Sequence, residues 1–85
     1  MGKDVMELEI ISPEKTLFSG QVRLVRLPGT KAPFTVLYNH APMITSLVEG
    51  KVSWESAGGE AEIAISGGFA EIRNNHVTLC VETGK

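Results

Sequence analysis

Glycine and proline divide the chain into pieces that leave little room for a helix. Nine glycines and four prolines are spread over the 85 residues. The main segments between them have ten residues or fewer, except 69–83, which Asn74-Asn75 interrupts. Helices in globular proteins average about 11–12 residues, whereas strands of about 5–6 residues fit these segments. The spacing therefore predicts an all-β chain.

Alternating hydropathy indicates that these pieces are strands. Apolar side chains occupy every second position in 6–10, 61–65 and 77–81. A period of two is typical of strands with one buried face. About eight to ten short strands in one chain predict an antiparallel two-sheet β-sandwich, or flattened barrel.

Three short sequences predict turns between the strands. Pro28-Gly29 suits a type II turn, in which proline supplies a φ of about −65° and glycine a positive φ. Gly58-Gly59 predicts a hairpin with a primed turn. Asn74-Asn75 predicts another hairpin, because asparagine tolerates the left-handed region. Ser66-Gly67-Gly68 resembles a phosphate-binding loop, but no lysine or helix follows, which favours a bulge or a close backbone approach.

Composition and charge exclude several classes of protein. Eight basic and ten acidic residues give a formal net charge of −2 without a basic run, which disfavours binding to nucleic acid. The apolar runs are too short for a membrane-spanning helix or a signal peptide, so no direct membrane insertion is expected. The single cysteine, Cys80, cannot form an internal disulfide, which fits a reducing compartment. One domain is expected over 1–85, with frayed ends at 1–4 and 83–85.

Side chains that perform catalysis or bind metals are few and scattered. Only His40, His76 and Cys80 supply nitrogen or sulfur ligands, and their spacing does not match a metal site. No serine lies in the G-x-S-x-G sequence of a nucleophile elbow. We therefore expect no catalytic residue, no metal, no cofactor and no enzymatic activity. Cys80 is interpreted as a small apolar filler and His76 as a solvated strand end.

Apolar residues exceed the needs of a single sandwich core. Leu17-Phe18 are neighbours, and the segments 24–27 and 43–48 place apolar side chains on both faces of an expected strand. Two explanations stay open, namely bulges that turn both neighbours inward or an outer face that binds another protein. The loop 38–42, with an aromatic residue, a polar pair and a proline, suits recognition and favours the second.

Four motifs carry a resemblance to a known family. They are Leu8–Lys15, Leu17–Gly20, His40-Ala41-Pro42 and Ser66–Glu71, in a match over about residues 6–82. Together they resemble the epsilon subunit of the F-type ATP synthase, in its N-terminal β-sandwich domain. The resemblance implies a non-catalytic subunit of the central stalk that binds the gamma subunit through one face and the membrane rotor ring through one end. Such a subunit couples ion-driven rotation to ATP synthesis, as a peripheral protein on the cytoplasmic face of the bacterial inner membrane.

The resemblance also suggests which residues make these contacts. As a hypothesis, the gamma-subunit interface comprises Leu17, Phe18, Pro42 and Ile44, and the loop near the rotor ring comprises Tyr38, Asn39, His40 and Ala41. Two stretches depart from the family, because Ala32-Pro33 stands where Gly-Glu is frequent and Tyr38-Asn39 where Pro-Gly is frequent. The detailed ring contact of the family therefore does not carry over.

Many bacterial members continue into a C-terminal helical hairpin that restrains ATP hydrolysis and in some cases binds ATP. If Lys85 is the natural end, the resemblance implies a short form that couples without this inhibitory arm and binds no nucleotide. An artificial truncation would fit the sequence equally well. The alternative function is a stand-alone β-sandwich module for a ligand or carbohydrate, which one tryptophan, one tyrosine and three phenylalanines support poorly.

Overall fold

The alternating segments form strands, as predicted, and no helix interrupts them within the described part of the chain. The computed structural model describes residues 4–84. In that range the strands are β1 (Met6–Ile11), β2 (Thr16–Val22), β3 (Leu24–Leu27), β4 (Phe34–Leu37), β5 (Met43–Leu47), β6 (Gly50–Ser56), β7 (Gly59–Ile65), β8 (Gly67–Arg73) and β9 (His76–Glu82). The prediction of an all-β chain is confirmed.

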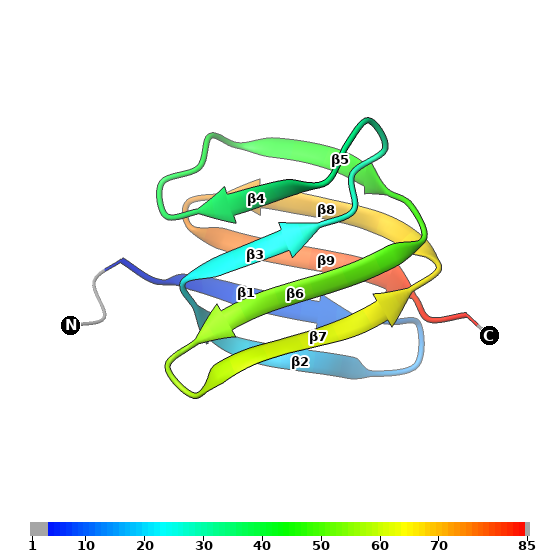
Figure 1. Ribbon diagram of the computed structural model, residues 1–85, viewed down its shortest axis with the longest axis horizontal. Helices are drawn as coiled ribbons and strands as arrows, with labels where there is room; N and C mark the ends of the chain where they lie inside the picture. The colour runs from blue at the N-terminus through cyan, green and yellow to red at the C-terminus, as the bar shows by residue number, and fades with distance from the viewer. Residues whose placement is uncertain (1–3, 85) are drawn as a thin grey trace.

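The strands form two sheets that pack face to face, with the four-stranded sheet in front of the five-stranded sheet in Figure 1. The five-stranded sheet has the order β2-β1-β9-β8-β5, and the four-stranded sheet has the order β4-β3-β6-β7. The predicted two-sheet sandwich is therefore correct. Neighbouring strands are antiparallel with one exception among residues 4–84, because β1 and β9 run parallel and pair Leu8 with Val77 and Ile10 with Leu79.

An apolar core fills the space between the sheets. The buried side chains of the described residues are all apolar, and those that form the core cluster are Met6, Leu8, Ile10, Val22, Val25, Leu27, Val36, Leu47, Val52, Trp54, Ile65, Ala70, Ile72, Val77, Leu79 and Val81. Each fully buried aliphatic side chain stabilises the fold by about 1.5–3 kcal/mol relative to its exposed state. Because strands alternate, burying these residues places their neighbours on the two outer faces.

A bulge in β2 explains the adjacent Leu17 and Phe18. Phe18 pairs with Ile10, whereas Thr16 pairs with Ile11, so Leu17 is the extra residue. Both Leu17 and Phe18 are half-buried and pack against the core. The Phe18 ring centroid lies 4.7 Å from that of Trp54 in β6, which links the two sheets. For this pair, the structure supports the bulge explanation of the apolar surplus.

Two of the predicted turns are wrong in detail. Gly29 has no positive φ, because it pairs with Leu47 across the sandwich and its N–H donates to the Leu27 carbonyl at 3.1 Å. Tertiary pairing thus overrides the type II turn. In the β6–β7 hairpin, positive φ occurs at Gly59, after the loop residues, whereas a primed turn needs it at the first loop residue.

The Asn74-Asn75 hairpin turn is confirmed, because φ is 52° at Asn74 and 60° at Asn75. The close backbone approach predicted for the Ser66-Gly67-Gly68 sequence is also confirmed. Gly68 has φ 147°, and a Cβ atom there would lie 2.2 Å from the Cys80 carbonyl oxygen. This position therefore requires glycine.

The ends of the chain fall partly outside the structure described. Residues 1–3 and 85 lie beyond its range, and β9 ends at Glu82. The prediction of frayed ends at 1–4 and 83–85 stays a prediction.

Candidate interaction surfaces

One strip of the outer face of the five-stranded sheet is apolar. This apolar band consists of Ile11, Cys80, Phe69 and Ile44. Strand register places Ile11 beside Cys80, and Cys80 beside Phe69, in one line across β1, β9 and β8. Ile44 in the edge strand β5 pairs with Glu71, so it lies diagonally next to Phe69. Phe69 is 51% exposed and Ile44 is 73% exposed, so both large side chains face away from the core.

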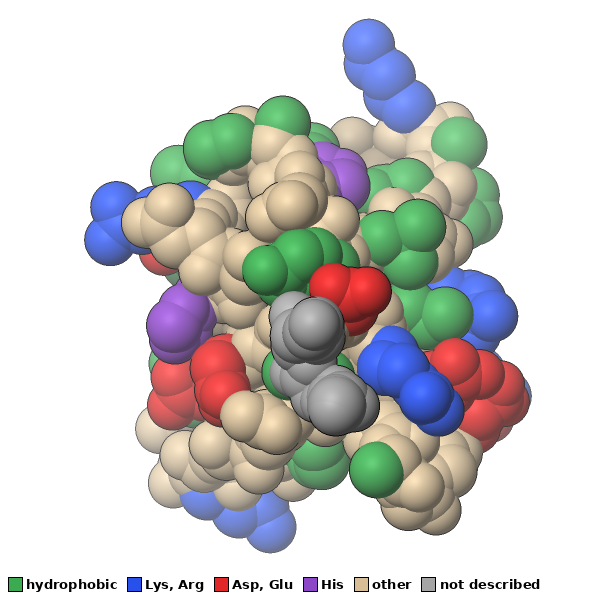
Figure 2. Space-filling model, turned by 90° about the vertical axis from the view of Figure 1, so that its left-hand side faces the viewer, with side chains coloured by type: hydrophobic (Ala, Val, Ile, Leu, Met, Phe, Trp, Pro, Cys, Tyr) green, Lys and Arg blue, Asp and Glu red, His purple; other side chains and the backbone are tan. Residues whose placement is uncertain are grey.

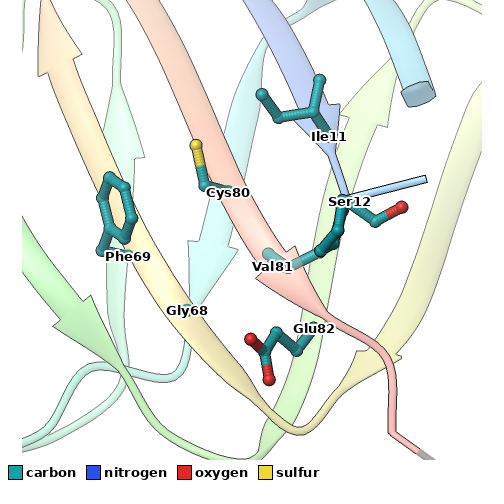
Figure 3. Close-up of a pocket in the computed structure, with 8 residues that line it drawn as sticks. Ile11, Ser12, Gly68, Phe69, Cys80, Val81 and Glu82 are labelled. Atoms are coloured by element: carbon teal, nitrogen blue, oxygen red, sulfur yellow. The ribbon is translucent and has the colours of Figure 1, made fainter. Parts of the chain in front are cut away.

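The apolar band continues into a shallow groove of about 350 Å³ (Figure 3). The groove is lined by Ile11, Ser12, Pro13, Gly68, Phe69, Cys80, Val81 and Glu82. Gly68 has no side chain, which leaves the floor open between Phe69 and the end of β9. Contiguous exposed apolar surface is rare on monomeric proteins and marks interaction sites.

Charged and polar side chains cover the rest of this outer face. One line across the sheet joins Glu9, Thr78 and Glu71, and the next joins Glu7, His76 and Arg73. The Arg73 Nε atom lies 3.6 Å from Glu71 Oε2, and Gln21 Nε2 donates to Glu7 Oε2 at 3.1 Å. These exposed pairs contribute little to stability. The outer face is thus divided between the apolar band and a mainly acidic half.

The loop 38–42 lies at one end of the sandwich, beside the β8–β9 turn. Figure 2 looks onto this end, where histidine side chains show at the surface. The His40 N–H donates to the Leu37 carbonyl at 3.0 Å, and Asn39 has φ 66°, which together are typical of a type II turn. His40 Nδ1 lies 2.7 Å from the Ala41 carbonyl oxygen. These two contacts are local to the loop, and Tyr38 is exposed.

The structure brings together only part of the predicted gamma interface. Ile44 lies in the apolar band, and Pro42 is exposed just before β5. Leu17 and Phe18 pack inward on β2, at the opposite edge of the same sheet. Four strand spacings separate the two edges, which amounts to about 19 Å. The four residues do not form one patch, whereas the four predicted ring-loop residues are continuous in the chain.

Sequence reasoning missed three members of the apolar band: Ile11, Phe69 and Cys80. Ile11 directly follows the buried Ile10, and adjacent residues of a strand point to opposite faces. The sequence therefore contained the information that one of these two isoleucines faces outward. Cys80 occupies an outward position between buried Leu79 and Val81, so its interpretation as a filler overlooked its place on the surface. The proximity of Ile11 to Cys80 depends on the parallel β1–β9 pairing, which local pattern does not predict. Phe69 and Cys80, by contrast, face each other across the β8–β9 hairpin, whose turn at Asn74-Asn75 was predicted.

Within residues 4–84, no three His, Cys, Asp or Glu side chains gather in a way that could hold a metal ion. His76 is exposed at the start of β9, as predicted for a solvated strand end. No helix that is long and apolar enough to cross a membrane is found among the described residues.

A sandwich with an apolar strip on one outer face has the features of an interaction domain. The chain belongs to the family "ATP synthase, Delta/Epsilon chain, beta-sandwich domain", whose model matches residues 5–84. It is 46% identical over 82 residues to the ATP synthase epsilon chain of Paracoccus denitrificans. It is 39% identical over 77 residues to that of Caulobacter vibrioides. The predicted resemblance to the epsilon subunit is confirmed, and this subunit is non-catalytic, as expected.

The relatives differ in how much of their length this chain matches. The Paracoccus alignment covers 95% of this chain but 55% of that protein, so the chain spans about half of this relative's length. The Caulobacter alignment covers 91% of this chain and 90% of that protein.

Two solved structures show the same fold at low sequence identity. A chain in the Euglena gracilis mitochondrial ATP synthase structure of OSCP, F1 and c-ring matches 92% of this chain, and 51% of its own length, with a TM-score of 0.86 and 21% identity. A chain in the Tetrahymena thermophila mitochondrial ATP synthase structure of the central stalk and c-ring matches 91% of this chain, and 63% of its own length, with a TM-score of 0.75 and 14% identity.

Proposed function

We propose that this chain works as the central-stalk epsilon subunit of a bacterial F-type ATP synthase. In this role it binds the gamma subunit and the rotor ring and couples ion-driven rotation to ATP synthesis. The observation that carries the proposal is the apolar band, which leaves Phe69 and Ile44 exposed on a domain of the epsilon-chain family. A stable stalk subunit needs such a surface to be covered by a partner.

We assign the gamma subunit to the apolar band, its groove and the neighbouring Pro42. Ile44 and Pro42 keep the role predicted from the sequence. Leu17 and Phe18 lie on β2 and pack against the core, so we leave them outside this interface. The acidic half of the same face provides the charged rim that protein interfaces usually have.

We assign the rotor ring to the end of the sandwich, through Tyr38, Asn39, His40 and Ala41. This loop lies at an end of the strands, whereas the apolar band lies on a face. The two partners can therefore bind at the same time without competing for surface. A close-packed apolar core between two hydrogen-bonded sheets has low compressibility, so it transmits force between the partners.

This role requires no cofactor, nucleotide or metal from the chain. It places the chain at the cytoplasmic face of the bacterial inner membrane as a peripheral component, held there by its partners.

Titration of the chain against its cognate purified gamma subunit tests the proposal. Phe69→Asp is the informative variant, and Leu37→Asp is the matched control, because Leu37 is 53% exposed but lies on the four-stranded sheet. We expect tight one-to-one binding by the wild type and the control. Placing a charge at the centre of an apolar interface should weaken binding by about 2 kcal/mol or more.

Circular dichroism and thermal unfolding establish that each variant remains folded. Equal loss of binding in both variants would show that the apolar band is not the specific interface with gamma. No binding by the folded wild type would overturn the epsilon role and favour the ligand-binding module instead.

A further inference from the structure

Two asparagines from separate loops hold each other at the end of the sandwich that carries the loop 38–42. The Asn39 N–H donates to Asn75 Oδ1 at 2.6 Å, and Asn75 Nδ2 donates to Asn39 Oδ1 at 3.3 Å. The Asn75 carbonyl also accepts a hydrogen bond from the Glu7 N–H at 2.9 Å. We call the reciprocal pair of hydrogen bonds the Asn39–Asn75 clasp.

The clasp extends the contact between β5 and β8 beyond their last ladder pair, Met43 with Ile72, into the loops next to it. The loop 38–42 connects β4 of the four-stranded sheet to β5 of the five-stranded sheet, whereas Asn75 lies between β8 and β9. Its carbonyl is tied to β1, so the side chain of Asn75 is held on the rigid five-stranded sheet. The loop is therefore attached at its middle as well as at its two strand ends.

The backbone conformation of the turn explains why asparagine is found at position 75, but it does not explain the clasp. Asn75 has φ 60°, which asparagine and glycine both accept in a hairpin turn. Asn74 has φ 52° and meets the same backbone demand. Only Asn75 forms hydrogen bonds with Asn39 among the side-chain contacts of the described residues. The side chain at 75 thus has a role beyond the turn.

We propose that Asn75 is a positioning residue that fixes the conformation in which the loop 38–42 meets the rotor ring. This inference rests on the ring assignment made above. The clasp satisfies the Asn39 N–H and holds its positive φ, which sets the direction in which Tyr38 and His40 leave the turn. Restricting the free loop in this way lowers the entropy that is lost when a partner binds.

Glycine substitutions at the two turn positions separate the clasp from the turn. Asn75→Gly keeps the positive φ and the main-chain bond to Glu7 but removes both clasp bonds. It also creates Asn-Gly, the favoured pair for this turn, so the fold is expected to persist. Asn74→Gly is the matched control, because it changes the same turn and leaves the clasp. Asn75→Asp is the conservative variant, since its carboxylate still accepts from the Asn39 N–H.

The first measurement is backbone amide hydrogen exchange by NMR in the free 85-residue chain. We expect the Asn39 amide to exchange about 3–10-fold faster in Asn75→Gly, in line with the loss of one hydrogen bond. The His40 amide, which donates to Leu37 within its own turn, is an internal reference and should change less. Asn74→Gly and Asn75→Asp should retain slow exchange at Asn39.

The second measurement is binding of gamma-bound chain to the purified rotor ring. We expect a loss of affinity of about 3–10-fold in Asn75→Gly alone, with rescue in Asn75→Asp and unchanged binding to gamma itself. Unchanged exchange at Asn39 would overturn the clasp, and faster exchange with unchanged ring affinity would overturn its positioning role. Absence of ring binding by the wild type would overturn both the ring assignment and the positioning role. The exchange data would still show whether the clasp itself exists, because they are measured without the ring.

Discussion

The outer faces of the two sheets differ, although both sheets bury apolar side chains on their inner faces. On the four-stranded sheet, Arg26 lies beside Ser53 and Ser53 beside Glu62, and Lys51 Nζ contacts Glu62 Oε2 at 3.2 Å. On the five-stranded sheet, the apolar band occupies the corresponding surface. A solvated sheet alternates apolar and polar residues. The four-stranded sheet departs from that rule at the Leu24–Leu37 pair, whereas the five-stranded sheet departs from it along the whole apolar band, and this larger apolar surface indicates a partner there.

The largest expected effect compares a glycine inside the five-stranded sheet with a glycine in the β6–β7 turn of the four-stranded sheet. Gly68→Ala in β8 forces a Cβ atom to within 2.2 Å of a carbonyl oxygen at φ 147°, whereas Gly58→Ala finds its nearest neighbour 4.0 Å away. We expect Gly68→Ala to lower the free energy of unfolding by about 3 kcal/mol or more, and Gly58→Ala to change it by about 1 kcal/mol or less. Urea unfolding measures both, and a mild effect at Gly68 would contradict the close strand packing.

A pair of phenylalanines compares the inner and outer faces of the five-stranded sheet. Phe18 is half-buried and its ring packs at a tilt against that of Trp54, so Phe18→Ala should destabilise the fold by about 2–3 kcal/mol. Phe69 is half-exposed on the apolar band, and Phe69→Ala should change stability by about 0.5–1 kcal/mol. Thermal unfolding of the isolated chain measures the difference. If the two variants unfold alike, the assignment of Phe18 to the core is wrong.

Charge substitutions compare the two outer faces in binding. Ile44→Lys places a charge on the apolar band, and Glu62→Lys changes the outer face of the four-stranded sheet. We expect Ile44→Lys to weaken gamma binding by about 1–2 kcal/mol, because the ammonium must lose water at an apolar contact. Glu62→Lys should leave the affinity unchanged. Calorimetric titration at constant salt measures both, and a stronger effect of Glu62→Lys would move the interface to the other sheet.

The smallest effect is expected for the ion pair on the four-stranded sheet. The Lys51 and Glu62 side chains are 66% and 57% exposed, so water screens their attraction. We expect Lys51→Gln to lower stability by about 0.5 kcal/mol or less, and the difference to shrink further in 1 M salt. A larger loss of stability would mean that the Lys51–Glu62 pair contributes more than an ordinary solvent-exposed ion pair.

Much of the fold followed from local pattern. Alternation at 6–10 and 77–81 predicted strands with one buried face, and Asn74-Asn75 predicted a turn that the structure contains. The candidate site was less accessible to such reasoning. Of the predicted gamma contacts, Ile44 is on the apolar band, but Leu17 and Phe18 are turned inward by a bulge that the order of residues does not reveal.

The amino-acid sequence by itself determined the all-β class, the sandwich and the family, because the period of two, the turn residues and the motifs are local properties. The tertiary structure decided which apolar side chains meet. Ile11 and Cys80 are far apart in the chain and become neighbours only through the parallel β1–β9 pair. The clasp likewise joins residues 36 positions apart. Such contacts depend on how strands pair at long range, and single-strand periodicity carries no information about that pairing.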